Sequence, residues 1–181
     1  MLTIKVPPGE FYTESTGSFT QLPEQTIQME HSLISVSKWE SKWHKPFFDG
    51  KDKTREETLD YFRCMSVTQN VNPLTWHNLS RENEEAIVQY IQDPMTGTTF
   101  NERNKHGRGG RQIISSEVLY WEMIELGIPF ECEKWHINRL FTLIHVCQVK
   151  SEGGKKMSRK DMVNQNKMLN AARRGRMGST G

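Results

Sequence analysis

Aromatic residues are confined to the first 149 of the chain's 181 residues, and this division limits where a core can form. Five Trp, eight Phe and four Tyr lie there, each able to remove about 150–250 Å² from water when buried. The last 32 residues carry nine basic and two acidic side chains, a formal charge of +7, against −5 for the rest. We therefore predict a mainly helical body over residues 1–149, and a basic linker and C-terminal helical arm over residues 150–181.

The N-terminal residues alternate between apolar and polar side chains, a pattern typical of strands. One alternation runs from Leu2 to Val6 and ends at a Pro-Pro pair, and another runs from Ile27 to His31. The stretch between them is polar and contains Gly9 and Gly17, so we expect a loop there. The two strands then form a short β-hairpin with a long connection.

From residue 37 onward, capping signals and a 3.6-residue period predict helices. The expected starts and spans are the capping boxes Ser37–Glu40 and Thr54–Glu57, the Asn72-Pro73 cap, Ser80 up to Asp93-Pro94, and helices over residues 112–126 and 134–149. Ile114, Val118 and Trp121 share one stripe of the helix over residues 112–126, and we expect this stripe to face the core. The helix over residues 134–149 has the widest apolar face, so we expect it to be central. Residues 101–111, which contain no apolar side chain, predict an exposed loop. The fold class is α+β, mainly α-helical, with an N-terminal β-hairpin and a compact helical bundle.

No specific catalytic motif occurs in the sequence: nucleotide-binding glycine loops, zinc-protease, serine-hydrolase and EF-hand patterns are all missing. Six His residues are scattered singly, which predicts no metal site. Cys64, Cys132 and Cys147 form no CxxC pair, and an odd number of cysteines favours a reducing compartment. No apolar run is long enough for a membrane span or a signal peptide. We therefore expect a soluble, non-enzymatic binding protein without a cofactor.

Two groups of residues are candidates for partner binding. Trp39 and Trp43 lie one helical turn apart beside several lysines, although core packing explains the same pattern. The second group combines flexible apolar and basic side chains of the tail: Met162, Met168, Leu169, Arg173 and Arg174. Nucleic acid is a less favoured partner, because residues 150–181 offer no aromatic side chain for stacking. A solvated tail without a binding role explains their composition equally well.

Most of the chain resembles the tail assembly chaperones of long-tailed, siphovirus-type bacteriophages. The resemblance rests on IQMEHSLISVSKWESKWHKPFF (residues 27–48), on ETLDYF, QNVNP and DPMTGTTF, and on PFECEKWHINRLFTLIHVCQV followed by MSRKDMVNQNKMLNAARRGR. It implies a partner, the tape-measure protein, whose long apolar helical chain such chaperones cover until tail-tube subunits polymerise. The tail-tube protein and self-association are further possibilities, and the host cytoplasm is the implied location.

Two alternatives stay open. A structural virion protein of the neck, connector or tail also combines a small body with a terminal arm, and it is present in purified virions at fixed copy number. A nucleic-acid-binding phage protein using the basic tail predicts strongly salt-dependent binding to DNA or RNA.

Overall fold

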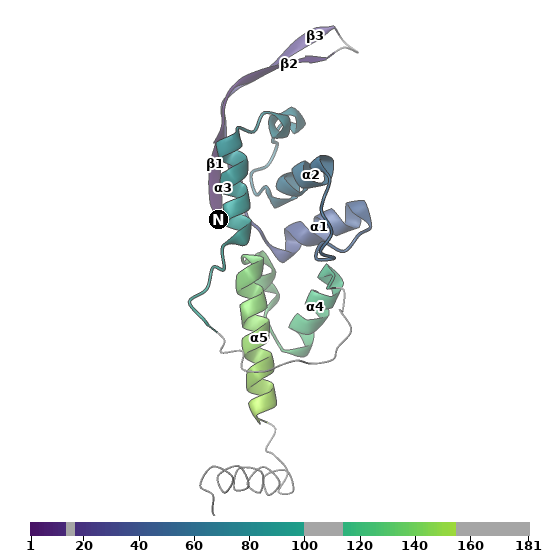
Figure 1. Ribbon diagram of the computed structural model, residues 1–181, viewed down its shortest axis with the longest axis vertical. Coiled ribbons are helices and arrows are strands. Elements are labelled where there is room, and N and C mark those ends of the chain that lie inside the picture. Colours follow the sequence, from purple (N-terminus) through teal and green to yellow (C-terminus); the bar gives the residue numbers. More distant parts are fainter. Residues whose placement is uncertain (14–16, 100–113, 155–181) are drawn as a thin grey trace, which may run out of the picture. The chain divides into compact units, whose positions relative to one another are not determined.

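The computed structural model describes residues 1–13, 17–99 and 114–154 (Figure 1). Contacts divide the chain into two units, Met1–His145 and Val146–Gly181, and only residues 146–154 of the second are described. The strands are β1 (Leu2–Val6), β2 (Gly9–Thr13), β3 (Ser18–Leu22) and β4 (Gln25–Met29). The helices are α1 (Leu33–Trp43), α2 (Arg55–Met65), η1 (Pro73–His77, a 3-10 helix), α3 (Arg81–Gln92), α4 (Ser116–Glu125), η2 (Phe130–Lys134, a 3-10 helix) and α5 (Ile137–Gly154). The fold is α+β and mainly helical, as predicted.

The N-terminal hairpin is longer than the sequence pattern predicts. Strands β1 and β4 pair antiparallel with Ile4 opposite Ile27, which confirms the predicted pairing. The stretch predicted as a loop instead forms a second antiparallel pair, β2 with β3, in which Phe11 lies opposite Thr20. Alternation is weak in these strands because their side chains are mostly exposed, so only Leu22 marks a buried face. The loop prediction was therefore wrong for most of this stretch.

Helix α1 begins at Leu33, five residues before the expected first helical residue, Lys38. Its cap is Ser32, whose hydroxyl accepts from the backbone N–H of Ser35, while the Ser35 hydroxyl accepts from the backbone N–H of Ser32. The expected box at Ser37 and Glu40 is therefore not used. Glu40 is buried and accepts hydrogen bonds from the backbone N–H groups of Phe47 (2.6 Å) and Ser116 (2.7 Å).

The next three helical starts agree with their capping signals. Thr54 and Glu57 form the predicted capping box of α2. Asn72 caps η1 with proline at its first turn, and Ser80 caps α3, which ends before the Asp93-Pro94 pair. Each cap satisfies a backbone donor that a helix start leaves unpaired, so local sequence decides these boundaries.

Both late helices have shifted boundaries. Helix α4 begins at Ser116 rather than near Gln112, and it ends where Gly127 adopts a positive φ of 64°. Helix α5 begins at Ile137 and continues to Gly154, through residues predicted as a linker. The predicted loop at residues 101–111 and the C-terminal arm beyond residue 154 lie outside the described residues.

One core draws on β4, α1, α2, α4 and the start of α5. The side chains excluded from solvent there include Ile27, Met29, Leu33, Val36, Trp39, Met65, Leu119, Met123, Ile137 and Leu140. Ile137, Leu140 and Ile144 are buried along one face of α5, at the spacing the sequence pattern predicts. The backbone N–H of Ile137 donates to the carbonyl of His31 (2.7 Å), which ties the start of α5 to the end of β4.

Candidate partner-binding surface

The tryptophan pair of α1 does not form an exposed surface. Trp39 is 1% exposed, and its indole N–H donates to the backbone carbonyl of Glu57 (2.9 Å). Trp43 is half-buried and donates to a carboxylate oxygen of Asp60 (3.0 Å). Trp39 therefore belongs to the core, so its candidacy for partner binding was wrong. Trp43 lies at the boundary between core and solvent.

The lysines beside these tryptophans are already paired within the protein. Lys42 Nζ lies 2.6 Å from Asp60, and Lys45 Nζ lies 2.5 Å from Glu57. The Lys45 ammonium and the backbone N–H of Thr54 hold the pKa of Glu57 below its usual range. These ion pairs connect α1 and the loop after it to α2. The lysines therefore do not flank an exposed aromatic surface. The tail candidates Met162, Met168, Leu169, Arg173 and Arg174 lie outside the described residues.

An exposed apolar surface occurs instead on α4 and η2. Trp121 is 60% exposed, Ile124 is 63% exposed, and Phe130 of η2 is 55% exposed. Trp121 and Ile124 are three residues apart on a helix, so their side chains are neighbours on one face. The ring of Phe130 has its centroid 6.4 Å from that of Tyr120, which lies one helical turn before Ile124. We call Trp121, Ile124 and Phe130 the α4 surface. The sequence pattern predicted Trp121 to be buried, and this prediction was wrong.

The opposite face of α4 is the buried one. Leu119 and Met123, four residues apart, are excluded from solvent. The orientation is fixed at both ends: Glu40 of α1 accepts from the backbone N–H of Ser116, and the N–H of Ile128 donates to the carbonyl of Met123 (2.8 Å). Large apolar side chains occupy both faces of α4, so periodicity alone does not determine which one is buried.

The segment that carries the α4 surface is acidic. Between Ser116 and Lys134 the chain carries one basic residue, Lys134, and the five acidic residues Glu117, Glu122, Glu125, Glu131 and Glu133. Partial burial and the neighbouring Glu125 raise the pKa of Glu122. The segment therefore combines exposed apolar side chains with a net charge of −4 (one basic against five acidic residues). Such a surface is complementary to an amphipathic helix with apolar anchors and flanking Lys or Arg.

Among the described residues, His31 and His136 form a buried pair that sequence spacing did not indicate. The rings of His31 and His136, 105 residues apart in the chain, have centroids 5.0 Å apart. Nδ1 of His31 shares a hydrogen bond with the Tyr61 hydroxyl (2.5 Å), and Nε2 of His136 donates to the Tyr90 carbonyl (2.9 Å). Both imidazoles are buried, and these contacts join β4, α2, α3 and α5. The pair therefore links segments that are far apart in the sequence.

The described residues offer little for metal or thiolate chemistry. Across residues 1–13, 17–99 and 114–154, no three His, Cys, Asp or Glu side chains lie close enough together to hold a metal ion. Burial raises the pKa of Cys64 to about 11 and also raises that of Cys132, where Glu131 adds to the effect. Both thiols are therefore protonated near neutral pH and are poor nucleophiles.

Comparison with known proteins yields no match: no family model, no curated protein and no solved structure is similar to this chain. Within the described residues, none of the helices has the length and apolar content that crossing a membrane requires.

Proposed function

We propose that the protein is a non-catalytic tail assembly chaperone of a long-tailed phage and that its α4 surface binds the tape-measure protein. The observation that carries this proposal is the exposure of Trp121, Ile124 and Phe130 together on adjacent elements. Large exposed apolar clusters mark interaction sites in soluble proteins, and Trp is the side chain most enriched among the residues that dominate binding energy.

The expected partner segment is an amphipathic helix. Its apolar side chains, spaced three or four residues apart, contact Trp121, Ile124 and Phe130 and remove them from water. Its Lys or Arg residues lie near the five glutamates of residues 116–134. Apolar burial then sets how slowly the complex dissociates, while charge attraction speeds encounter and weakens with salt.

Co-expression with the tape-measure protein of the same phage tests the proposal. Wild-type protein should keep the tape-measure protein in the soluble fraction. A variant with Trp121→Ser and Ile124→Ser should fail to do so while keeping its own melting curve. The matched control is Val88→Ser, which replaces an exposed apolar side chain on α3, outside the α4 surface. This control should behave as wild type.

Purified virions provide the second readout. A chaperone is missing from finished particles, whereas a neck, connector or tail protein is retained at fixed copy number. If co-expression never solubilises the tape-measure protein, and the protein is found in virions, the chaperone assignment is wrong and the structural alternative replaces it.

The basic tail should tune the complex rather than create it. Because α5 continues to Gly154, past the predicted end of the body at residue 149, the truncation that removes the tail should follow Gly154. We expect the truncated protein to keep the tape-measure protein soluble, with lower efficiency. Complete loss of that function on truncation would instead make residues 155–181 the main binding element.

A further inference from the structure

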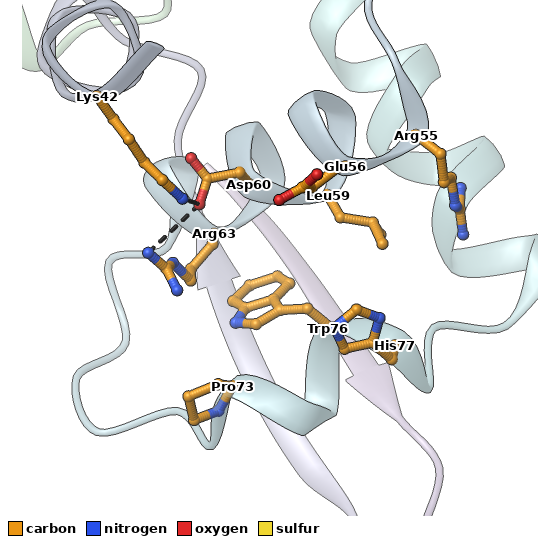
Figure 2. A pocket seen from close by; sticks show the side chains of 9 residues that line it. All are labelled: Lys42, Arg55, Glu56, Leu59, Asp60, Arg63, Pro73, Trp76 and His77. Carbon is orange, nitrogen blue, oxygen red and sulfur yellow. Dashed lines mark hydrogen bonds and ion pairs between the residues drawn. The ribbon is translucent and has the colours of Figure 1, made fainter.

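A second candidate binding site lies between α2 and η1, and it shares no residue with the α4 surface (Figure 2). This pocket, with a volume of about 600 Å³, is bounded by α2, by η1 and by one side chain of α1. Its lining combines apolar groups, two carboxylates and several cations: Lys42, Arg55, Glu56, Leu59, Asp60, Arg63, Pro73, Trp76 and His77.

Trp76 contributes an unsatisfied hydrogen-bond donor to this site. The residue is 3% exposed, and its indole N–H has no hydrogen-bond partner among the described residues. Figure 2 shows the nitrogen edge of the indole turned toward the side of the pocket where Arg63 and Pro73 lie. A buried donor without a partner is destabilising and rare in folded proteins. An acceptor bound at this position would satisfy it.

Lys42 and Arg63 have more N–H donors than their ion pairs with Asp60 use. Asp60 is buried and forms ion pairs with Lys42 Nζ (2.6 Å) and with Arg63 (3.3 Å), and its other oxygen accepts from Trp43. A guanidinium has five N–H groups and an ammonium three, so Arg63 and Lys42 keep donors that face solvent. Arg55 forms a two-pronged pair with Glu84. Arg63 and Trp76 are thus the donors best placed for a ligand.

We propose that this pocket binds a single carboxylate carried by a peptide segment of a partner protein. One carboxylate oxygen accepts from the Trp76 indole N–H and the other from Arg63, whose half-exposed side chain can rotate toward it. Leu59 and Pro73 supply apolar contact for the residue that bears the carboxylate.

Local charge favours a carboxylate over a nucleic-acid backbone. The pocket is lined by three permanent cations, Lys42, Arg55 and Arg63, and by two carboxylates, Glu56 and Asp60. Arg55 is already paired with Glu84, so the remaining charges of the lining sum to zero, and binding of one carboxylate rests on the donors of Trp76 and Arg63. A chain of phosphates would bring several negative charges close to Glu56, and the pocket lacks the surplus of cations that such a chain requires.

NMR of the full-length protein tests the site. The Trp76 indole N–H resonance is assigned with Trp76→Phe and followed during titration with four probes. Two carry a carboxylate: acetyl-leucyl-glutamyl-amide, and acetyl-leucyl-leucine with a free C-terminus. The other two are the neutral acetyl-leucyl-glutaminyl-amide and inorganic phosphate. We expect both carboxylate probes to shift the resonance, and their relative affinity distinguishes a side-chain from a C-terminal carboxylate. The neutral probe should bind at least about tenfold more weakly.

Arg63→Gln is the test variant and Arg81→Gln the matched control, since Arg81 is exposed on α3 and does not line this pocket. Asp60 keeps Lys42 and Trp43 as partners in Arg63→Gln, so the fold should persist. We expect Arg63→Gln to weaken binding about tenfold or more and Arg81→Gln to leave it unchanged. Equal binding of the charged and neutral probes, equal loss in both variants, or tighter binding of phosphate than of either carboxylate would overturn the proposal.

Discussion

Trp39 and Trp121 occupy helices of the same fold and have opposite environments. Trp39, on α1, is buried and donates to a backbone carbonyl of α2, whereas Trp121, on α4, is mostly exposed. The sequence pattern allowed either core packing or partner binding for Trp39 and placed Trp121 on an apolar stripe expected to be buried. An aromatic residue at helical spacing therefore shows that a helix has an apolar face, without showing what covers it.

The difference between the two helices has a physical origin. On α1, polar and charged residues occupy much of the outer face, so the apolar face has one direction in which to pack. On α4, Leu119 and Met123 compete with Trp121 and Ile124, and contacts from distant residues decide between them. One such contact is the hydrogen bond from the Ser116 backbone to Glu40, 76 residues away. Where both faces are apolar, the one left exposed is a candidate interface.

The largest expected effect is a difference in the free energy of unfolding between two variants, in which Trp39 or Trp121 is replaced by alanine. Trp39→Ala should lower the free energy of unfolding by about 3–5 kcal/mol, because it opens a cavity and leaves the Glu57 carbonyl without its donor. Trp121→Ala should cost less than about 1 kcal/mol, since its side chain is mostly in water already. Urea denaturation of both variants measures the difference. Similar losses for the two would mean that α4 packs by the face containing Trp121.

Acidification should destabilise the buried region by the next largest amount. Burial, together with the neighbouring His136, lowers the pKa of His31 from 6.5 to about 3. The unfolded chain gains a proton on His31 below about pH 6.5, and the folded protein gains it only near pH 3. The contribution of neutral His31 to the free energy of unfolding is therefore fully present above pH 6.5. It decreases by about 1.4 kcal/mol per pH unit as the pH falls toward 3. Between pH 7 and pH 5 we expect a loss of about 2 kcal/mol.

Urea denaturation at several pH values checks this slope. The variant His31→Gln keeps a polar group beside the Tyr61 hydroxyl and removes the titrating imidazole. Its stability should depend less on pH than that of the wild type over the same range, whatever its absolute value. A slope unchanged by the substitution would show that His31 is not the group responsible.

We expect a smaller effect on the free energy of unfolding at Trp43, whose exposure to solvent lies between those of Trp39 and Trp121. Trp43→Phe removes the indole N–H that donates to Asp60 (3.0 Å) and keeps most of the ring packing. Lys42 and Arg63 still compensate the Asp60 charge, so the free energy of unfolding should fall by about 1 kcal/mol. Trp121→Phe is the control and should be close to neutral. A loss of 3 kcal/mol or more would place Trp43 in the core beside Trp39.

Local signals in the sequence predicted much of the fold. The capping box of Thr54 and Glu57, the Asn72-Pro73 cap and the Ser80 start are decided within four residues, and each has the expected partner. Pairing of the first and last strands follows from alternation in β1 and β4. The buried face of α5 likewise follows from spacing alone, because its apolar residues concentrate on one side.

Features that depend on distant residues were missed. Glu40 has the spacing of a capping residue but is buried as an acceptor for Phe47 and Ser116. The His31–His136 contact joins residues 105 positions apart, and no local pattern marks it. The Trp76 pocket is assembled from α1, α2 and η1, so its residues are scattered over 36 positions of the sequence. For α4, counting apolar residues on both faces would have indicated that one of them stays exposed.

The most direct test of partner binding through α4 is ¹⁹F NMR of protein labelled with 5-fluorotryptophan. The five tryptophans give five resonances, and Trp121→Phe and Trp39→Phe assign the two that matter. In the free protein, the Trp121 resonance should respond to the exchange of H₂O for D₂O, and the Trp39 resonance should not. On forming the complex with the tape-measure protein, the Trp121 resonance should shift and lose this solvent response while that of Trp39 stays in place. A complex that forms with the Trp121 resonance unchanged would contradict the account.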